Sequence, residues 1–219
     1  MESLFQHQDS QEFLDRSYSL LMMEADRGCI LLGVSMLDEE LTKFFKSILP
    51  LGTSKSREKD IFDGKGAFGN LSAKLDVAYV CQLLPRDLVD CIHHLRKLRN
   101  NLAHAVSPFT IEENLEHIFE VFNRTNGNLP AGLAHLSGEI VYQSFLRKVM
   151  GTDHPTEVGK KLFDSQDEAI AYLHESDTVK TTLVQQRIKT MFIIGISTLA
   201  ALIIFHREKV IKRLHVNKA

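Results

Sequence analysis

The sequence predicts an all-α fold, a helical bundle followed by a C-terminal single-pass hydrophobic helix. Apolar residues recur at helical spacing over much of the chain, strand-type alternation is scarce, and an uncharged apolar run covers Met191–Phe205. With 219 residues, 44% of them hydrophobic, the chain can build one core plus an appendage. We expect a helical domain over residues 8–150, a polar connector with a short helix over 151–186, and a membrane anchor with a basic tail over 187–214.

Two apolar-periodic helices are expected at the beginning of the chain. The first covers Ser10–Met23, and the second covers Arg27–Leu49 and carries enough apolar side chains to be largely buried. A proline, a glycine and a polar run then break the pattern, which predicts a loop over residues 50–69.

The next two helices surround Pro85. Asn70 or Ser72 can cap the first of them, and the second is expected to run over Arg86–His104. The stretch Arg96–His104 therefore lies at the C-terminal end of a helix. The predicted core stripe of this helix is Leu88, Val89, Ile92, Leu95, Leu98 and Leu102.

Shorter helices are expected further along the chain. Thr110–Phe122 combines a capping residue with acidic side chains in the first turn, and Pro130 lies beyond its end. Glu139–Met150 and Gln166–His174 have helical patterns, with a short strand over Glu139–Phe145 as an alternative.

The charge is distributed unevenly. Residues 181–219 contain seven Lys or Arg and one acidic residue, so they carry +6, and residues 1–180 carry −8 of the total of −2. An acidic body repels a phosphate backbone, and no helix-turn-helix is evident, so direct DNA binding is disfavoured.

The apolar run near the C-terminus resembles a membrane anchor. Counted over Ile188–Phe205 it would span about 27 Å, close to the ~30 Å of a hydrocarbon core. The N-terminus lacks the pattern of a signal peptide, which places the body in the cytoplasm. The topology stays open because more basic residues follow the run than precede it. The alternative is a buried terminal helix of the domain.

Three cysteines, Cys29, Cys81 and Cys91, are an odd number at wide spacing, which indicates buried thiols in a reducing compartment. Cys91 lies beside His93 and His94, but no second ligand pair has suitable spacing, so no metal site is expected. Gly64–Gly69 has the glycine spacing of the dinucleotide-binding motif G-x-G-x-x-G. A nucleotide site is not expected there, because no buried strand precedes the glycines. The glycine run is interpreted as a flexible lead into a helix, and no cofactor is expected.

Arg99, Asn100 and His104 are the candidate catalytic residues. An arginine can bind a phosphate and a histidine can exchange a proton near neutral pH, which suffices for metal-free RNA cleavage. In an ideal helix, however, Arg99 and His104 are roughly 140° apart, whereas Asn100 and His104 share a face. The pair can meet only at a distorted helix end or across two subunits. Alternatively, Arg99 pairs with the acidic body and His104 caps the helix.

Two sequence blocks resemble the mannitol operon repressor family. They are Asp26–Leu41 and Gly66–Tyr79, the second running on to Arg96–His104 and Phe109–Thr110, and the resemblance covers about residues 12–124. It implies an all-helical domain that forms a homodimer and regulates transcription through a protein partner. The first functional hypothesis is therefore a membrane-tethered regulatory module of this type that does not bind DNA directly.

Arg99-Asn100 with His104 also resembles the motif of HEPN domains, within a similar helical context. This resemblance implies a dimeric metal-independent endoribonuclease, with RNA as partner. Arg99 would bind the scissile phosphate, Asn100 would orient it, and His104 would act as acid or base. Inactive HEPN scaffolds also exist, so the resemblance leaves enzymatic activity open.

Overall fold

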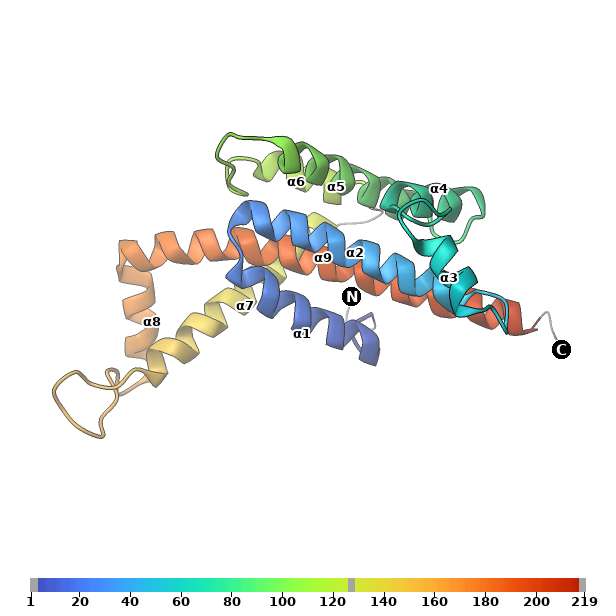
Figure 1. Ribbon diagram of the computed structural model, residues 1–219. Helices are drawn as coiled ribbons and strands as arrows, with labels where there is room; N and C mark the ends of the chain where they lie inside the picture. The colour runs from blue at the N-terminus through green and yellow to red at the C-terminus, as the bar shows by residue number, and fades with distance from the viewer. Residues whose placement is uncertain (1–3, 126–128, 217–219) are drawn as a thin grey trace.

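A computed structural model of the chain describes residues 4–125 and 129–216 (Figure 1). The described residues form helices joined by short loops, with one isolated bridge between Asp153 and Lys161 and no other strand pairing. The all-α prediction is therefore confirmed. The helices are α1 (Gln8–Met23), α2 (Asp26–Ser47), α3 (Lys55–Phe62), α4 (Leu71–Val80), α5 (Arg86–His104), α6 (Leu115–Phe122), α7 (Leu129–Gly151), α8 (Gln166–Glu175) and α9 (Asp177–Val216).

The longest helix, α9, runs through the centre of the molecule (Figure 1). α1 and α2 lie along it, α7 crosses it, and α5 packs over α2 with α4 and α6 beside it. α8 connects the outer end of α7 to the beginning of α9, and a small separate cluster of Leu146, Ala169 and Leu173 holds this arm together.

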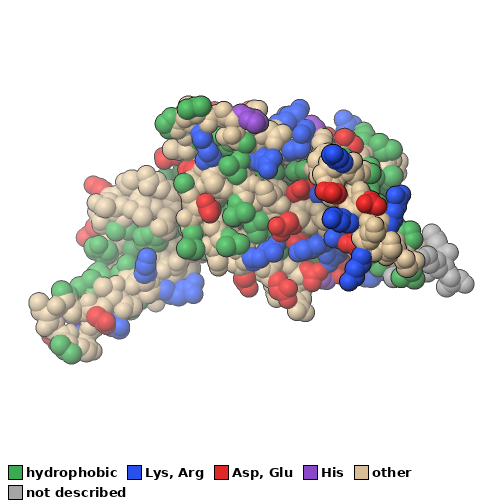
Figure 2. Space-filling model, in the orientation of Figure 1, with side chains coloured by type: hydrophobic (Ala, Val, Ile, Leu, Met, Phe, Trp, Pro, Cys, Tyr) green, Lys and Arg blue, Asp and Glu red, His purple; other side chains and the backbone are tan. Residues whose placement is uncertain are grey.

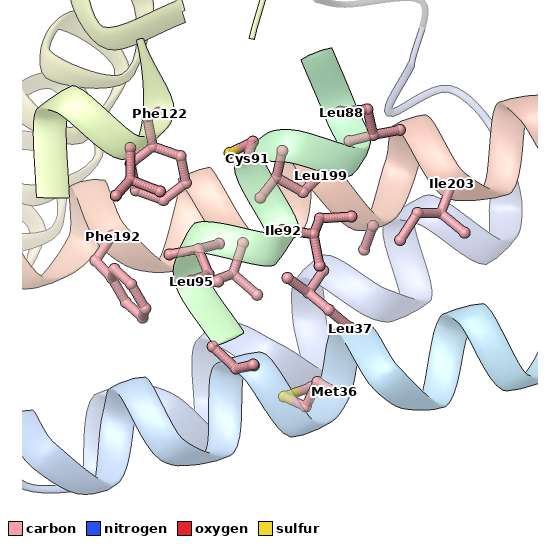
Figure 3. Close-up of a cluster of buried hydrophobic side chains, with 14 of the residues drawn as sticks. Met36, Leu37, Leu88, Cys91, Ile92, Leu95, Phe122, Phe192, Leu199 and Ile203 are labelled. Carbon is pink, nitrogen blue, oxygen red and sulfur yellow. The ribbon is translucent and has the colours of Figure 1, made fainter. Parts of the chain in front are cut away.

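The main core forms where α2, α5 and α6 meet α9 (Figure 3). Phe192 and Leu199 of α9 are fully buried among side chains such as Leu37, Ile92 and Phe122. Burying one such side chain contributes about 1.5–3 kcal/mol to folding. The predicted core stripe of α5 is confirmed, since all six of its residues are buried.

Polar contacts fix α9 against α1 along most of its length. Ser17 and Ser197 share a buried hydrogen bond of 2.9 Å. Lys189 Nζ donates to the backbone oxygens of Met22, at 3.0 Å, and of Glu24, and so satisfies carbonyls at the end of α1. Near the other end of α9, Arg207 pairs with Asp9.

α9 is long and apolar enough to cross a membrane, by length and composition. In the structure, however, side chains from Thr190 to Ala201 are all buried inside the bundle. A helix that is hydrophobic on all sides fits either a membrane or a protein core. Here the helix also extends continuously across residues 186 and 187, where the connector was expected to meet the anchor.

Two local predictions differ from the structure, and one alternative is excluded. α3 occupies part of the expected loop over 50–69, capped by Ser54, whose hydroxyl accepts from Arg57 N at 3.2 Å. α7 begins at Leu129, well before the start of the helix expected over Glu139–Met150, and Pro130 lies in its first turn, where a missing N–H costs nothing. Residues 139–145 are helical, which excludes the alternative strand.

Candidate functional site

A pocket of about 390 Å³ forms where α5, the beginning of α4 and the middle of α2 meet. Two arginines of α5 and the first residues of α4 face each other across it, so cationic and backbone amide groups share one cavity. The polar side chains that line it belong to Ser35, Asp38, Asn70, Ser72, Arg96, Arg99 and Asn100.

The two arginines are three residues apart and therefore lie on the same side of α5. The Nε atom of Arg96 is buried and has no hydrogen-bond partner in the described structure. Arg99 is exposed, and its Nη1 donates to Asn100 Oδ1 at 3.2 Å. Within residues 4–125 and 129–216, no carboxylate pairs with either guanidinium, so both charges are available to a ligand.

Among the described residues that line the pocket, Asp38 is the one acidic side chain, and Lys74 neutralises it. The Lys74 ammonium lies 2.6 Å from Asp38 Oδ1, and the Lys74 side chain is only 5% exposed. The net charge of the pocket therefore comes from Arg96 and Arg99.

The beginning of α4 adds backbone donors. Asn70 caps the helix by accepting from Ala73 N at 3.0 Å, whereas the amides of Leu71 and Ser72 have no acceptor among the described residues. The first amides of a helix carry partial positive charge and bind anions readily. This helix end therefore complements the two arginines.

The glycine run before α4 is a tight turn and does not form a flexible lead. A Cβ atom on Gly69 would lie 2.1 Å from the backbone oxygen of Asp63, and one on Gly66 would lie 2.2 Å from that of Asp60. Phe68 anchors the turn by stacking on Phe45, with ring centroids 4.3 Å apart. The glycines thus allow close backbone packing that sets the start of α4, and the preceding element is a helix.

The pocket brings together two of the three predicted catalytic residues. Arg99 and Asn100 line it, and His104 does not. Because α5 stays helical through His104, the roughly 140° offset between Arg99 and His104 persists. His104 is exposed and has no partner among the described residues. Its catalytic role stays a prediction.

Other pocket residues were outside the predicted site. Arg96 lies in the stretch Arg96–His104, where the sequence predicts catalytic residues only at Arg99, Asn100 and His104. Asn70 is predicted only as a helix cap. The sequence signal that could have identified Arg96 as a pocket residue is its position beside the apolar stripe of α5. Asp38 and Ser35 carried no such signal, because only the packing of α2 against α5 brings them to the pocket.

The cysteines differ in their environments. Cys29 and Cys91 are buried as expected, and burial raises the pKa of each thiol to about 12. Cys81 is exposed, so the prediction of a buried thiol is wrong there. It follows the last residue of α4, where the helix ends at the surface. The Cys91 side chain points into the core (Figure 3) and is fully buried, whereas His93 and His94 are partly exposed.

No protein-family model matches the chain, and comparisons with curated proteins and with solved structures found no match. The resemblances to the mannitol operon repressor family and to HEPN domains therefore stay predictions.

Proposed function

We propose that the protein is a regulatory helical module that binds a phosphate-bearing ligand in the pocket of Arg96 and Arg99. One observation carries this proposal. Two arginines that have no carboxylate partner among the described residues line the same pocket as the free backbone amides at the start of α4. A guanidinium offers paired donors that match phosphate oxygens, and a helix N-terminus adds favourable charge.

Regulation through a protein partner, by a homodimer of the mannitol-repressor type, is part of this proposal. The acidic charge of −8 over residues 1–180 supports it, since such a body does not favour a DNA duplex. The pocket is also a single cavity, suited to one phosphate group and its immediate substituents.

Calorimetric titration of the full chain tests the proposal, with inorganic phosphate and a short single-stranded RNA as probes at constant ionic strength. We expect binding of at least one probe to weaken by about tenfold in Arg96→Gln and in Arg99→Gln, as for a lost charge-assisted hydrogen bond. Lys97→Gln is the matched control, since it removes one exposed charge from the same helix outside the pocket. Equal affinity in all variants, or no binding of either probe, would refute the proposal that this pocket binds a phosphate group.

The endoribonuclease is a second candidate, favoured because Arg99 and Asn100 share the pocket. The position of His104 requires that a second subunit supplies the histidine. RNA cleavage in EDTA by the wild type, abolished in His104→Ala, would support it. Mixing Arg99→Gln with His104→Ala chains should then restore part of the activity if the site is shared. A verified dimer that cleaves no RNA would exclude this candidate.

Membrane tethering through Ile188–Phe205, with the body in the cytoplasm, is a separate proposal supported by the length and composition of α9. It requires α9 to leave the bundle, because the same side chains fill the core. Carbonate extraction of the full chain tests it. Resistance to extraction would support a spanning helix, and complete release would refute it.

A further inference from the structure

A second pocket, of about 580 Å³, lies at the end of the bundle where the α4–α5 turn meets the last turns of α9. Arg86, Lys209 and Arg213 line it together with His206, and no carboxylate is found among the described residues of its lining. Tyr79 and Val80 form part of the apolar side of the same pocket. Its chemistry is therefore cationic and apolar at once.

The charges near the end of α9, from Arg207 to Arg213, separate into two groups. Arg207 pairs with Asp9, and Glu208 lies 2.5 Å from His7, so these two residues are engaged with the N-terminal segment. The remaining cations of this stretch are Lys209, Lys212 and Arg213.

These three cations have no carboxylate partner in the part of the chain that the structure describes. Lys209 Nζ lies 4.1 Å from the centroid of the Phe205 ring, a cation–π contact that leaves its charge uncompensated. Arg86 pairs with Asp90 at 3.5 Å, but both side chains are largely exposed, so this ion pair offsets little of the positive charge of Arg86.

Large apolar side chains lie beside these cations. Tyr79 is 48% exposed, Val80 75% and Phe205 42%. We call this set the basic end surface, made up of Tyr79, Val80, Phe205, Lys209, Lys212 and Arg213. In Figure 2, hydrophobic and basic side chains, with some acidic ones, lie at the end of the molecule where α3, α4 and the last turns of α9 are found.

We propose that the basic end surface docks the protein on an anionic phospholipid membrane. Cations attract anionic headgroups while neighbouring apolar and aromatic side chains enter the interface, which is the composition of peripheral membrane-binding surfaces. A nucleic acid backbone would use the charges but not Val80 or Phe205. The acidic charge of residues 1–180 repels the membrane and so orients this end toward it. α9 stays inside the bundle throughout.

Co-sedimentation of the full chain with vesicles tests the proposal. One set contains phosphatidylcholine alone, and the other includes about one third phosphatidylserine. We expect binding only to the anionic vesicles and release at about 0.5 M salt, where the Debye length is short. Lys209→Gln with Arg213→Gln should weaken partitioning roughly 25-fold, about fivefold for each charge removed. Val80→Ser should weaken it as well.

Lys65→Gln with Lys97→Gln is the matched control, because both side chains are exposed and lie outside this surface. Equal binding to neutral vesicles, an equal loss in the control, or no binding to any vesicle would overturn the proposal. Association that resists carbonate would also overturn it, in favour of a spanning α9. Binding to polyglutamate or RNA without binding to vesicles would reassign the surface to a macromolecular partner.

Discussion

The ring of Phe122 lies directly against the backbone of Gly195. A Cβ atom built on Gly195 would lie 2.4 Å from Cζ of that ring, closer than real contacts allow. Both rings of the neighbouring pair Phe122 and Phe192 are fully buried, with centroids 6.1 Å apart. A glycine in the middle of α9 therefore allows α6 to approach α9 closely.

Gly195→Ala should destabilise the protein by about 1–3 kcal/mol, because the added methyl group overpacks a closed site. The measurement is urea unfolding followed by circular dichroism. Gly138→Ala is the control, since the nearest atom to its new Cβ is Arg187 Nε at 3.5 Å, an ordinary contact. A stability unchanged by Gly195→Ala would show that α9 is not packed in this core in solution.

Arg27→Met should loosen the segment that follows α5. Arg27 Nη1 donates to Ala105 O at 2.9 Å and Nη2 donates to Ser107 O, while Asp26 accepts from Ile111 N at 2.8 Å. We expect a loss of about 1–2 kcal/mol and faster amide hydrogen exchange over 105–111. Arg57→Met, on the surface of α3, should change neither quantity; similar effects of both variants would contradict this assignment.

Asp38→Asn should destabilise the protein by about 2 kcal/mol, since it leaves the Lys74 ammonium in a nearly closed site without a carboxylate. This loss is below the 3–5 kcal/mol typical of a fully buried pair, because the Asp38 side chain is 35% exposed. The double variant Asp38→Asn with Lys74→Met should recover most of the stability. Additive losses in chemical denaturation would show that the two residues are not coupled.

Thiol labelling should distinguish the three cysteines. At neutral pH only Cys81 should react rapidly with an aromatic disulfide reagent, because Cys29 and Cys91 are buried and their pKa values are raised to about 12. All three should react in urea. Mass spectrometry of the labelled peptides identifies the reacting thiols, and rapid labelling of Cys91 in the folded protein would contradict the packing of α5.

The same two thiols should make the protein less stable at alkaline pH. Their folded pKa of about 12 lies above the ordinary value of 9.0, so the unfolded state loses protons first as the pH rises above 9. Their contribution to stability is therefore complete below pH 9 and declines from there toward 12. A variant with Cys29→Ala and Cys91→Ala should show a shallower fall of the melting temperature over this range, whatever its absolute stability.

Amphipathic helices were the most predictable part of the fold. The bounds of α5 were predicted from one apolar stripe and a proline at each side, and the structure confirms them. α3 was missed because it buries no side chain fully and its sequence has no apolar period. Sequence alone could not assign the environment of α9, since lipid and a protein core favour the same uniformly apolar helix.

The candidate site was predictable only on α5. Arg99 and Asn100 stood out because polar residues interrupt an apolar helix pattern, and the pocket includes both. Asp38 and Ser72 join them through contacts between α2, α4 and α5, which no local pattern encodes. The position of His104 outside the pocket follows from a helix that continues without distortion to its last residue.

The central position of α9 also determines when the protein can fold during synthesis. The hydrogen bond between Ser17 and Ser197 joins residues 180 positions apart, and the core side chains of α9 leave the ribosome after those of the helices that precede it. α1 and α2 must therefore wait, with the apolar faces that contact α9 uncovered, until α9 has been synthesised. Contacts of such long sequence separation slow folding, so the nascent chain presents a long window for chaperone binding. A premature stop codon before α9 would remove the helix around which the others assemble.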